Sequence, residues 1–165
     1  MEDVERAYIA GLFDGEGCTS VIYTQYKKHD RERLYEGFKV ILVISNQDKR
    51  VLKQVRLLFG KGGIYSQEKE GFTTQGRRQK TSYDFRISKP IEIIEIVELI
   101  SPYVRVKQED LENIYKASKF ILKLRGSNER HKWTTEEKDD FLKFASTSKA
   151  LKGAGKRGRP RTYPL

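Results

Sequence analysis

The chain has 165 residues, of which 37% are hydrophobic and 34% are charged; the charged share of a typical globular domain is about 25%. This length suits a single domain, and no stretch approaches the ~20 consecutive apolar residues of a membrane-spanning helix, which excludes a membrane protein. The 33 Lys and Arg residues against 23 Asp and Glu give a net charge of +10, which favours a polyanionic partner.

The first part of the chain predicts the order helix, strand, strand, helix. A helix capped by Asp3 runs to about Asp14, where glycines end it. Residues rich in Thr, Tyr, Val and Ile predict strands over 18–28 and 38–44, which together suggest a long hairpin. Apolar residues at helical spacing then predict an amphipathic helix over 48–59, which ends at a glycine.

Two further strands and two helices follow. The strands are predicted over 64–69 and 80–87, and the second alternates apolar and polar side chains. One face of this strand should therefore be core, and the other wet or bound. Helices are predicted over 90–100, which begins at a proline, and over 108–124.

The order of these elements predicts an α+β fold with one domain over residues 1–125. A linker and C-terminal helix over 126–148 and a basic, flexible tail over 149–165 follow it. A capping box of Thr134 and Glu137 predicts a short helix to about Ser146, and Trp133 is predicted to be a hydrophobic anchor. The tail has six basic side chains and no acid, which suits a phosphate-rich partner.

Cysteine usage and the N-terminal sequence indicate the compartment. A single cysteine, Cys18, cannot form an internal disulfide, and with only two histidines the chain has too few ligands for a structural zinc site. The acidic start lacks the basic and apolar regions of a signal peptide. We expect an intracellular protein that is not secreted, either cytoplasmic or organelle-encoded.

Small residues recur along one side of the first predicted helix. Ala7, Gly11 and Gly15 are spaced four residues apart, with Ala10 beside them. Each glycine costs about 0.8–1.0 kcal/mol of helix propensity relative to alanine, so a packing contact should offset this cost. Such a stripe allows two helix backbones to approach closely.

Two acids lie at the end of the same helix. Asp14 and Glu16 are placed where the helix dipole is negative, which disfavours a carboxylate by about 0.3–1 kcal/mol. A hard divalent cation between carboxylates would reverse this penalty, because oxygen ligands are those that Mg²⁺ prefers. The alternative is that both acids are solvated turn residues.

Residues 9–17 read IAGLFDGEG and follow Tyr8. This segment resembles the signature of the LAGLIDADG homing endonucleases. The resemblance implies an αββαββα domain with a curved antiparallel DNA-binding sheet and one motif per chain. It also implies that the motif helices of two chains pack at a twofold axis, which makes a homodimer. The interface residues that it implies are Ala7, Gly11, Asp14 and Gly15.

The resemblance also assigns a catalytic centre. It implies that the last acid of the motif, Glu16, binds a divalent metal together with the backbone carbonyl of Gly15. The expected metal is Mg²⁺, with Mn²⁺ able to substitute and Ca²⁺ supporting binding without cleavage. Lys107 is similar to the catalytic lysine of the family, with Arg105 as the alternative. The other catalytic residues that it implies are Asn46, Gln47 and Arg50.

The polar faces of the predicted strands suit the major groove of DNA. Arg and Lys there read guanine, Gln reads adenine and Asp accepts from cytosine. We therefore expect this face to bind a long, pseudo-palindromic double-stranded target. The predicted DNA-binding residues are Ser20, Thr24, Tyr26, Lys28, Lys39, Tyr65, Gln67, Lys69, Arg77, Arg78, Lys80, Ser82, Asp84 and Arg86.

These features together predict a site-specific double-strand DNA endonuclease, encoded in an intron, that hydrolyses phosphodiester bonds as a homodimer. One alternative is a catalytically inactive nucleic-acid-binding module, such as an RNA maturase or a DNA regulator. Another is an architectural binder of A·T-rich DNA, because residues 156–161 resemble an AT-hook.

Overall fold

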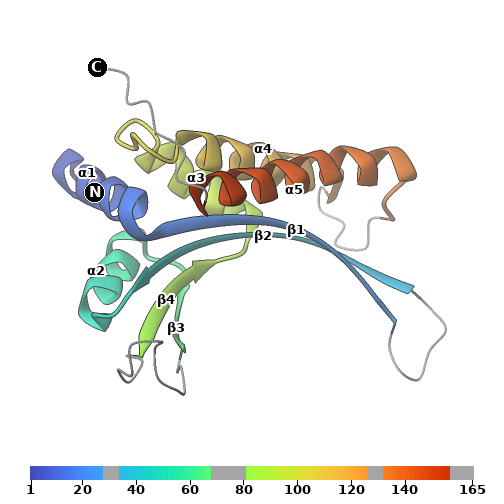
Figure 1. The fold of residues 1–165 in the computed structure, drawn as a ribbon. Helices are drawn as coiled ribbons and strands as arrows, with labels where there is room; N and C mark the ends of the chain where they lie inside the picture. The colour runs from blue at the N-terminus through green and yellow to red at the C-terminus, as the bar shows by residue number, and fades with distance from the viewer. Residues whose placement is uncertain (28–33, 68–80, 126–131, 157–165) are drawn as a thin grey trace.

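The computed structural model describes residues 1–27, 34–67, 81–125 and 132–156 (Figure 1). For Tyr26, Lys27, Leu34, Tyr35, Arg125 and residues 154–156, only the backbone is described. This part of the chain forms an α+β fold whose first seven elements run in the predicted order αββαββα, followed by two more helices. The predicted fold class is therefore confirmed.

The sheet is built on the predicted long hairpin. Strands β1 (Gly17–Lys27) and β2 (Leu34–Asn46) pair antiparallel along the whole of β1. Strands β3 (Gly63–Gln67) and β4 (Ser82–Ile87) complete an antiparallel sheet with the order β1-β2-β4-β3. In this described sheet, β1 and β3 are therefore the edge strands.

The first two helices follow their local signals closely. Helix α1 (Asp3–Glu16) starts one residue earlier than predicted, because Glu2 is its cap and the Glu5 carboxylate accepts a hydrogen bond from the Glu2 N–H at 2.9 Å. Helix α2 (Lys49–Phe59) is capped by the Asp48 side chain and ends at Gly60, whose φ of 65° is left-handed. Glycine reaches this φ without a steric penalty.

The remaining helices are α3 (Pro90–Ile100), α4 (Gln108–Arg125) and α5 (Thr135–Lys156). None of the helices in the described ranges is long and apolar enough to span a membrane. In the capping box of α5, the Thr134 hydroxyl accepts from the Glu137 N–H at 3.2 Å, and the Glu137 carboxylate accepts from the Thr134 N–H at 2.8 Å.

The prediction that α5 is short was wrong. The helix runs to Lys156 instead of ending near Ser146, so 149–156, assigned to a flexible tail, are helical. Phe141 and Ser148 of α5 are buried, and the helix packs against α4 and β1. These tertiary contacts sustain the helix beyond the point where its local pattern weakens. Residues 157–165, including most of the AT-hook-like segment, lie outside the described residues.

The helices lie on the convex side of an arched sheet, and its concave side is open (Figure 1). The core fills the space between these layers. Its largest fully buried side chains come from helices and strands alike and include Phe13, Leu42, Phe85, Ile93 and Phe141.

The segment before α5 belongs to this core. The Trp133 ring stacks on Phe38 of β2 with a centroid distance of 3.6 Å and an interplanar angle of 9°. Phe141 meets both rings edge-on, at 5.2 Å from Phe38 and 5.7 Å from Trp133. The predicted role of Trp133 as a hydrophobic anchor is confirmed, and the ring fixes α5 to the outer part of the hairpin.

A charged bridge also ties α5 to the hairpin. The Glu36 carboxylate accepts hydrogen bonds from the Lys138 ammonium at 2.7 Å and from the Tyr23 hydroxyl at 2.6 Å. The Lys138 hydrogen bond is the main reason why the pKa of Glu36 is held below its ordinary value of 4.5. The same bridge raises the pKa of Lys138.

This bridge predicts a pH dependence of stability. The pKa of Glu36 is lowered in the folded state, so its ionised carboxylate stabilises the fold. This contribution to the free energy of unfolding is complete above the unfolded pKa of 4.5 and is lost as the pH falls through the folded pKa. We expect Glu36→Gln to be less stable than the wild type at neutral pH and to lose this deficit at acid pH. Urea unfolding midpoints of the wild type and of Glu36→Gln, measured at neutral and at acid pH, test this prediction. A deficit that does not change with pH would exclude a charge contribution.

Candidate functional site

The end of α1 is fixed by a turn that is distant in sequence. The Asp14 carboxylate accepts hydrogen bonds from the backbone N–H groups of Arg105, Val106 and Lys107 at 2.8, 3.1 and 3.0 Å. These N–H groups precede α4, so Asp14 caps the entry to that helix rather than its own. The contacts offset the unfavourable dipole of α1, and no cation is required to explain this acid.

Lys107 lies against the backbone of the motif, residues 9–17. Its ammonium donates to the carbonyl oxygens of Gly17 at 2.7 Å, Phe13 at 3.2 Å and Gly15 at 3.5 Å. A cation at this position stabilises the negative end of the α1 dipole. The predicted catalytic lysine thus contacts the carbonyl of Gly15 that was predicted to bind metal. Arg105, the alternative, has an exposed side chain.

Glu16, the acid at the end of the motif, lines a pocket. Glu16 is exposed, and within the described ranges no side chain or backbone group forms a hydrogen bond or an ion pair with its carboxylate. The pocket has a volume of about 510 Å³ and brings together residues from α1, β2, β3, β4 and the β2–α2 turn. It is lined by Glu16, Ser45, Asn46, Gln47, Gln67, Ser82 and Asp84.

The second carboxylate of this pocket is already satisfied. Asp84 is 5% exposed and accepts hydrogen bonds from the Ser45 hydroxyl at 2.7 Å, the Arg86 guanidinium at 2.7 Å and the Gln67 amide. These bonds offset the cost of burying a charge. Asp84 was predicted to bind DNA; in this structure its carboxylate is committed to these neighbours. Ser45 was not among the predicted site residues, because only the strand register places it opposite Asp84.

The turn between β2 and α2 brings two of the predicted catalytic residues to the pocket. The Asn46 side-chain oxygen accepts from the Asp48 N–H at 2.8 Å, which fixes the turn. Gln47 follows it and is exposed. Asn46 therefore has a local structural role, whereas Gln47 is presented to solvent beside Glu16.

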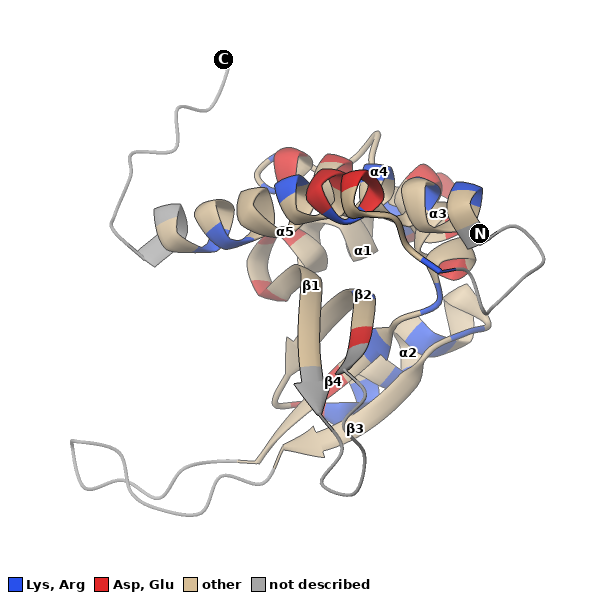
Figure 2. Cartoon of the chain, turned by 90° about the vertical axis from the view of Figure 1, so that its right-hand side faces the viewer, with Lys and Arg blue, Asp and Glu red and all other residues tan. Residues whose placement is uncertain are grey.

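Arg50 does not line this pocket. Its guanidinium binds the Asp48 carboxylate at 2.7 Å, with 89% of the arginine side chain exposed, and holds the pKa of Asp48 below its ordinary value. The structure therefore places Arg50 on the helix cap rather than in the pocket. Helix α2 is nevertheless a strongly basic element beside the site (Figure 2). Its basic residues are Lys49, Arg50, Lys53 and Arg56.

The donor atoms at this pocket are of the kind that a hard cation binds. Carboxylate and amide oxygens suit Mg²⁺, and Glu16, Asn46 and Gln47 supply both types. In the described ranges, no group of three or more His, Cys, Asp or Glu side chains is placed so that it could hold a metal ion. The residues therefore fit a divalent ion as a partial ligand set, because the described lining of this pocket offers a single uncommitted carboxylate, that of Glu16.

The small residues of α1 form a bare face. Gly11 and Gly15 are exposed, and a Cβ atom added to either would meet no other atom within 4 Å. Val4, with 77% exposure, and Tyr8, with 48% exposure, extend this face. Ala7 is also exposed, whereas Ala10, predicted to lie beside the stripe, is in the core.

The concave side of the sheet carries the predicted DNA-binding residues that can be placed. The register pairs Ile22 with Lys39 and Tyr65 with Asp84 on this side, and the buried Val21 and Phe85 point to the other. The predicted residues with described side chains on this open face are Ser20, Thr24, Lys39, Tyr65, Gln67, Ser82, Asp84 and Arg86. Lys28, Lys69, Arg77, Arg78 and Lys80 lie outside the described residues, as does the side chain of Tyr26.

The open face is hollowed as well as polar. Lys39, Ile41, Tyr65 and Arg86 contribute to a groove of about 660 Å³. The Arg86 guanidinium lies 5.5 Å from the centroid of the Tyr65 ring and is also bound to Asp84. Arg86 is therefore positioned by a carboxylate and by an aromatic ring before any ligand binds.

Solved structures of similar fold are homing endonucleases at low sequence identity. The homing endonuclease I-CvuI in complex with the I-CreI target, in the presence of Mg and with DNA not cleaved, has a TM-score of 0.62 at 14% identity, covering 98% of this chain and 87% of that chain. The archaeal intron-encoded homing endonuclease I-Vdi141I complexed with DNA has a TM-score of 0.66 at 15% identity, covering 99% and 91%. The LAGLIDADG meganuclease I-CpaMI bound to uncleaved DNA has a TM-score of 0.62 at 19% identity, covering 97% of this chain and 52% of that chain.

These identities establish the fold. Among curated proteins, no sequence matches the chain. The family model of the LAGLIDADG-like domain matches residues 3–149, which include the motif, the whole sheet and most of α5. On this match, the chain belongs to the LAGLIDADG family.

Proposed function

We propose that this chain is a site-specific DNA endonuclease, encoded in an intron, that cuts both strands of its target as a homodimer with a divalent metal ion. One observation supports this most directly. Among the described residues, the Glu16 carboxylate has no hydrogen-bond or ion-pair partner, and Glu16 lies between the bare face of α1 and the open face of the sheet. The carboxylate of Glu16 is therefore available to a ligand, whereas that of Asp14 is bound by backbone N–H groups.

The homodimer follows from the number of motifs. Cutting two strands requires two phosphoryl-transfer centres, and this chain supplies one motif. A twofold axis at the bare face of α1 would bring two Glu16 carboxylates together and would complete the partial ligand set. The lengths of the similar structures support one motif domain per chain. This chain covers 98% of I-TnaI but only 52% of I-CpaMI, which is about twice as long.

We assign Mg²⁺ as the metal, with Mn²⁺ able to substitute and Ca²⁺ supporting binding only. When bound, the ion would lower the pKa of a water molecule and stabilise the leaving oxygen. Structures of I-CvuI with DNA in the presence of Mg and of Ca support a divalent ion. In this chain Glu16 would hold it, and the Gly15 carbonyl would join after Lys107 releases its 3.5 Å contact.

The other site residues have roles that their positions support. Gln47, exposed beside Glu16, would orient a water molecule, and Asn46 would hold the turn that presents it. Lys107, released from the α1 carbonyls, would stabilise charge that develops on the phosphate. Arg50 would contact a phosphate from the start of α2 only by exchanging its bond to Asp48. The open face of the sheet would read the bases.

A target-selection experiment tests this function. We expect the full chain, incubated in Mg²⁺ with a library of random duplexes, to cut a small set of related sequences with approximate twofold symmetry. Sequencing of the cut ends gives the target, and the same incubation in Ca²⁺ is the binding-only control. Cut sites without sequence preference, or cutting of one strand only, would contradict a site-specific homodimeric nuclease.

A second candidate function is an inactive nucleic-acid-binding module of the same fold, such as a maturase or a regulator. The contact between the Lys107 ammonium and the Gly15 carbonyl favours it, because a cation already lies where a metal would be needed. In that case the library would be bound selectively in both Mg²⁺ and Ca²⁺, and no ends would be produced.

A further inference from the structure

Helix α5 carries a row of lysines on one side. Lys138 and Lys149 are eleven residues apart, which is about three helical turns, and Lys152 follows one turn later on the same side. After Asp140 the helix contains no acidic residue. Lys138 is bound to Glu36, whereas Lys149 and Lys152 are exposed.

This side of α5 runs along the edge of the sheet. The Val21 N–H of edge strand β1 donates to the Ser148 hydroxyl at 3.2 Å, and Ser148 is 4% exposed. An unpaired backbone donor on an edge strand is thus satisfied by the helix. The contact fixes the position of the lysine row relative to β1.

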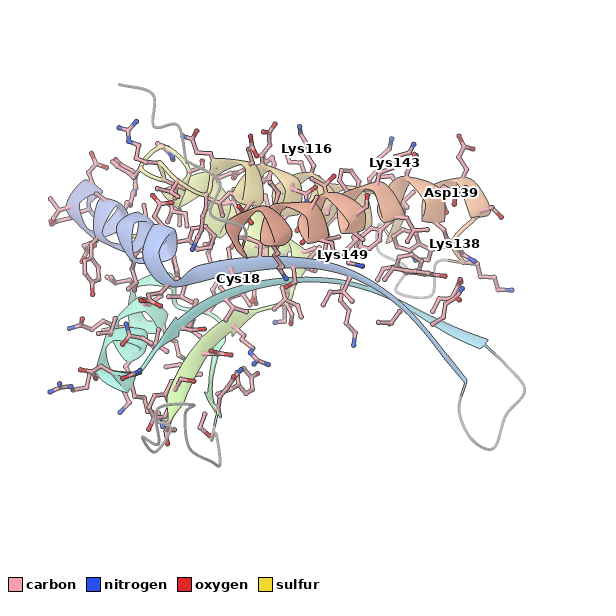
Figure 3. All side chains as sticks on the ribbon, viewed as in Figure 1. Cys18, Lys116, Lys138, Asp139, Lys143 and Lys149 are labelled. Atoms are coloured by element: carbon pink, nitrogen blue, oxygen red, sulfur yellow. The ribbon has the colours of Figure 1, made fainter. Side chains whose placement is uncertain are left out.

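Lys152 reaches the open face around this edge. Its ammonium donates to the Ser20 hydroxyl at 2.6 Å. Thr19 and Val21 are buried on the helix side of β1, so Ser20 points to the concave side. In Figure 3, Lys149 lies on the sheet side of α5, whereas Lys143 lies on the side away from it.

We propose that Lys149 and Lys152 bind the phosphate backbone of duplex DNA that lies on the concave face, as a flank to the base-reading strands. The proposal rests on the proposed DNA binding and adds a contact outside the four strands. The two lysines are separated by about 4.5 Å along the helix, so phosphates of a single DNA strand are within reach of both.

The helix dipole alone does not explain this arrangement. Basic residues in the last turns of any helix complement its negative end, but that effect does not select one side of the helix. Lys143 provides the comparison, because it lies on the opposite side and is neutralised by Asp140 at 2.7 Å. Among the described lysines on the side of α5 that borders β1, Lys149 and Lys152 form no ion pair, and Lys152 reaches the concave face at Ser20.

The test compares the salt dependence of DNA binding. The full chain and its variants bind a fluorescent random-sequence duplex in Ca²⁺, and the affinity is measured by anisotropy over a series of KCl concentrations. We expect Lys149→Gln/Lys152→Gln to reduce the slope of log affinity against log salt by up to about 0.9 per lost contact in each protomer. The arginine pair, Lys149→Arg/Lys152→Arg, should keep the slope because it keeps the charge. Lys143→Gln, the matched control on the same helix, should also keep it.

Each outcome decides the proposal. An unchanged slope in the glutamine pair, an equal loss in Lys143→Gln, or a loss in the arginine pair would overturn it. If the wild type cuts no member of the library but the glutamine pair shows the loss, the lysine contact stands and the nuclease function fails. If the wild type cuts and the slope does not change, the nuclease function stands and the lysine contact fails. Circular dichroism of each variant confirms that the helix is retained.

Discussion

Replacing Glu16 by glutamine should abolish cleavage while leaving DNA affinity almost unchanged. The amide keeps the size of the side chain but removes the charge that would hold the metal ion. Because no described group contacts this carboxylate, the substitution breaks no internal hydrogen bond. We expect the single-turnover cleavage rate in Mg²⁺ to fall by at least ~10²–10³-fold, the loss typical of removing one group that stabilises transition-state charge. Affinity for the selected target is measured in Ca²⁺.

The matched control is Glu136→Gln, the same change at an exposed position in the first turn of α5. It should cut and bind like the wild type. A Glu16→Gln protein that cuts at the wild-type rate would show that the metal assignment is wrong. A wild type that binds its target but cuts no better than Glu16→Gln would instead identify the chain as the inactive binding module.

Local signals in the sequence were sufficient to predict most of the helices and strands. Asp48 and Gly60 mark the ends of α2, because a cap side chain and a left-handed glycine act within one turn. The alternation in β4 correctly separated Phe85 and Ile87 from Asp84 and Arg86. These features depend on neighbours in the chain, which is why they were predictable.

The candidate site depends on contacts between distant residues. Asp14 meets the N–H groups of Arg105 and Lys107 across more than ninety residues, and no local pattern indicates that partner. The burial of Asp84 follows from its register opposite Ser45, which a single strand does not reveal. The ion pair between Arg50 and Asp48, the cap of its own helix, is local. It was nevertheless missed, because the family resemblance implied a catalytic role for Arg50.

Replacing Gly11 by leucine should break the proposed homodimer while stabilising the monomer. A Cβ atom at this position meets nothing within 4 Å in one chain, and glycine is about 0.8–1.0 kcal/mol below alanine in helix propensity, with leucine ranking next to alanine. In a dimer packed through the bare face of α1, the same side chain would separate the two backbones, and such overpacking costs about 1–3 kcal/mol at each copy. The mass is measured by light scattering, and stability by urea unfolding.

Gly153→Leu is the control that separates these two effects. Gly153 is also an exposed glycine within a helix, and an added Cβ there meets nothing within 4 Å. Gly153→Leu should gain helix propensity in the same way and should leave the mass of the protein unchanged. The comparison is made once light scattering shows that the wild type is a dimer. If Gly11→Leu remained dimeric, the interface would lie elsewhere on the surface. If it became monomeric and still cut both strands, one Glu16 per complex would suffice, and the argument from one motif to two protomers would be wrong.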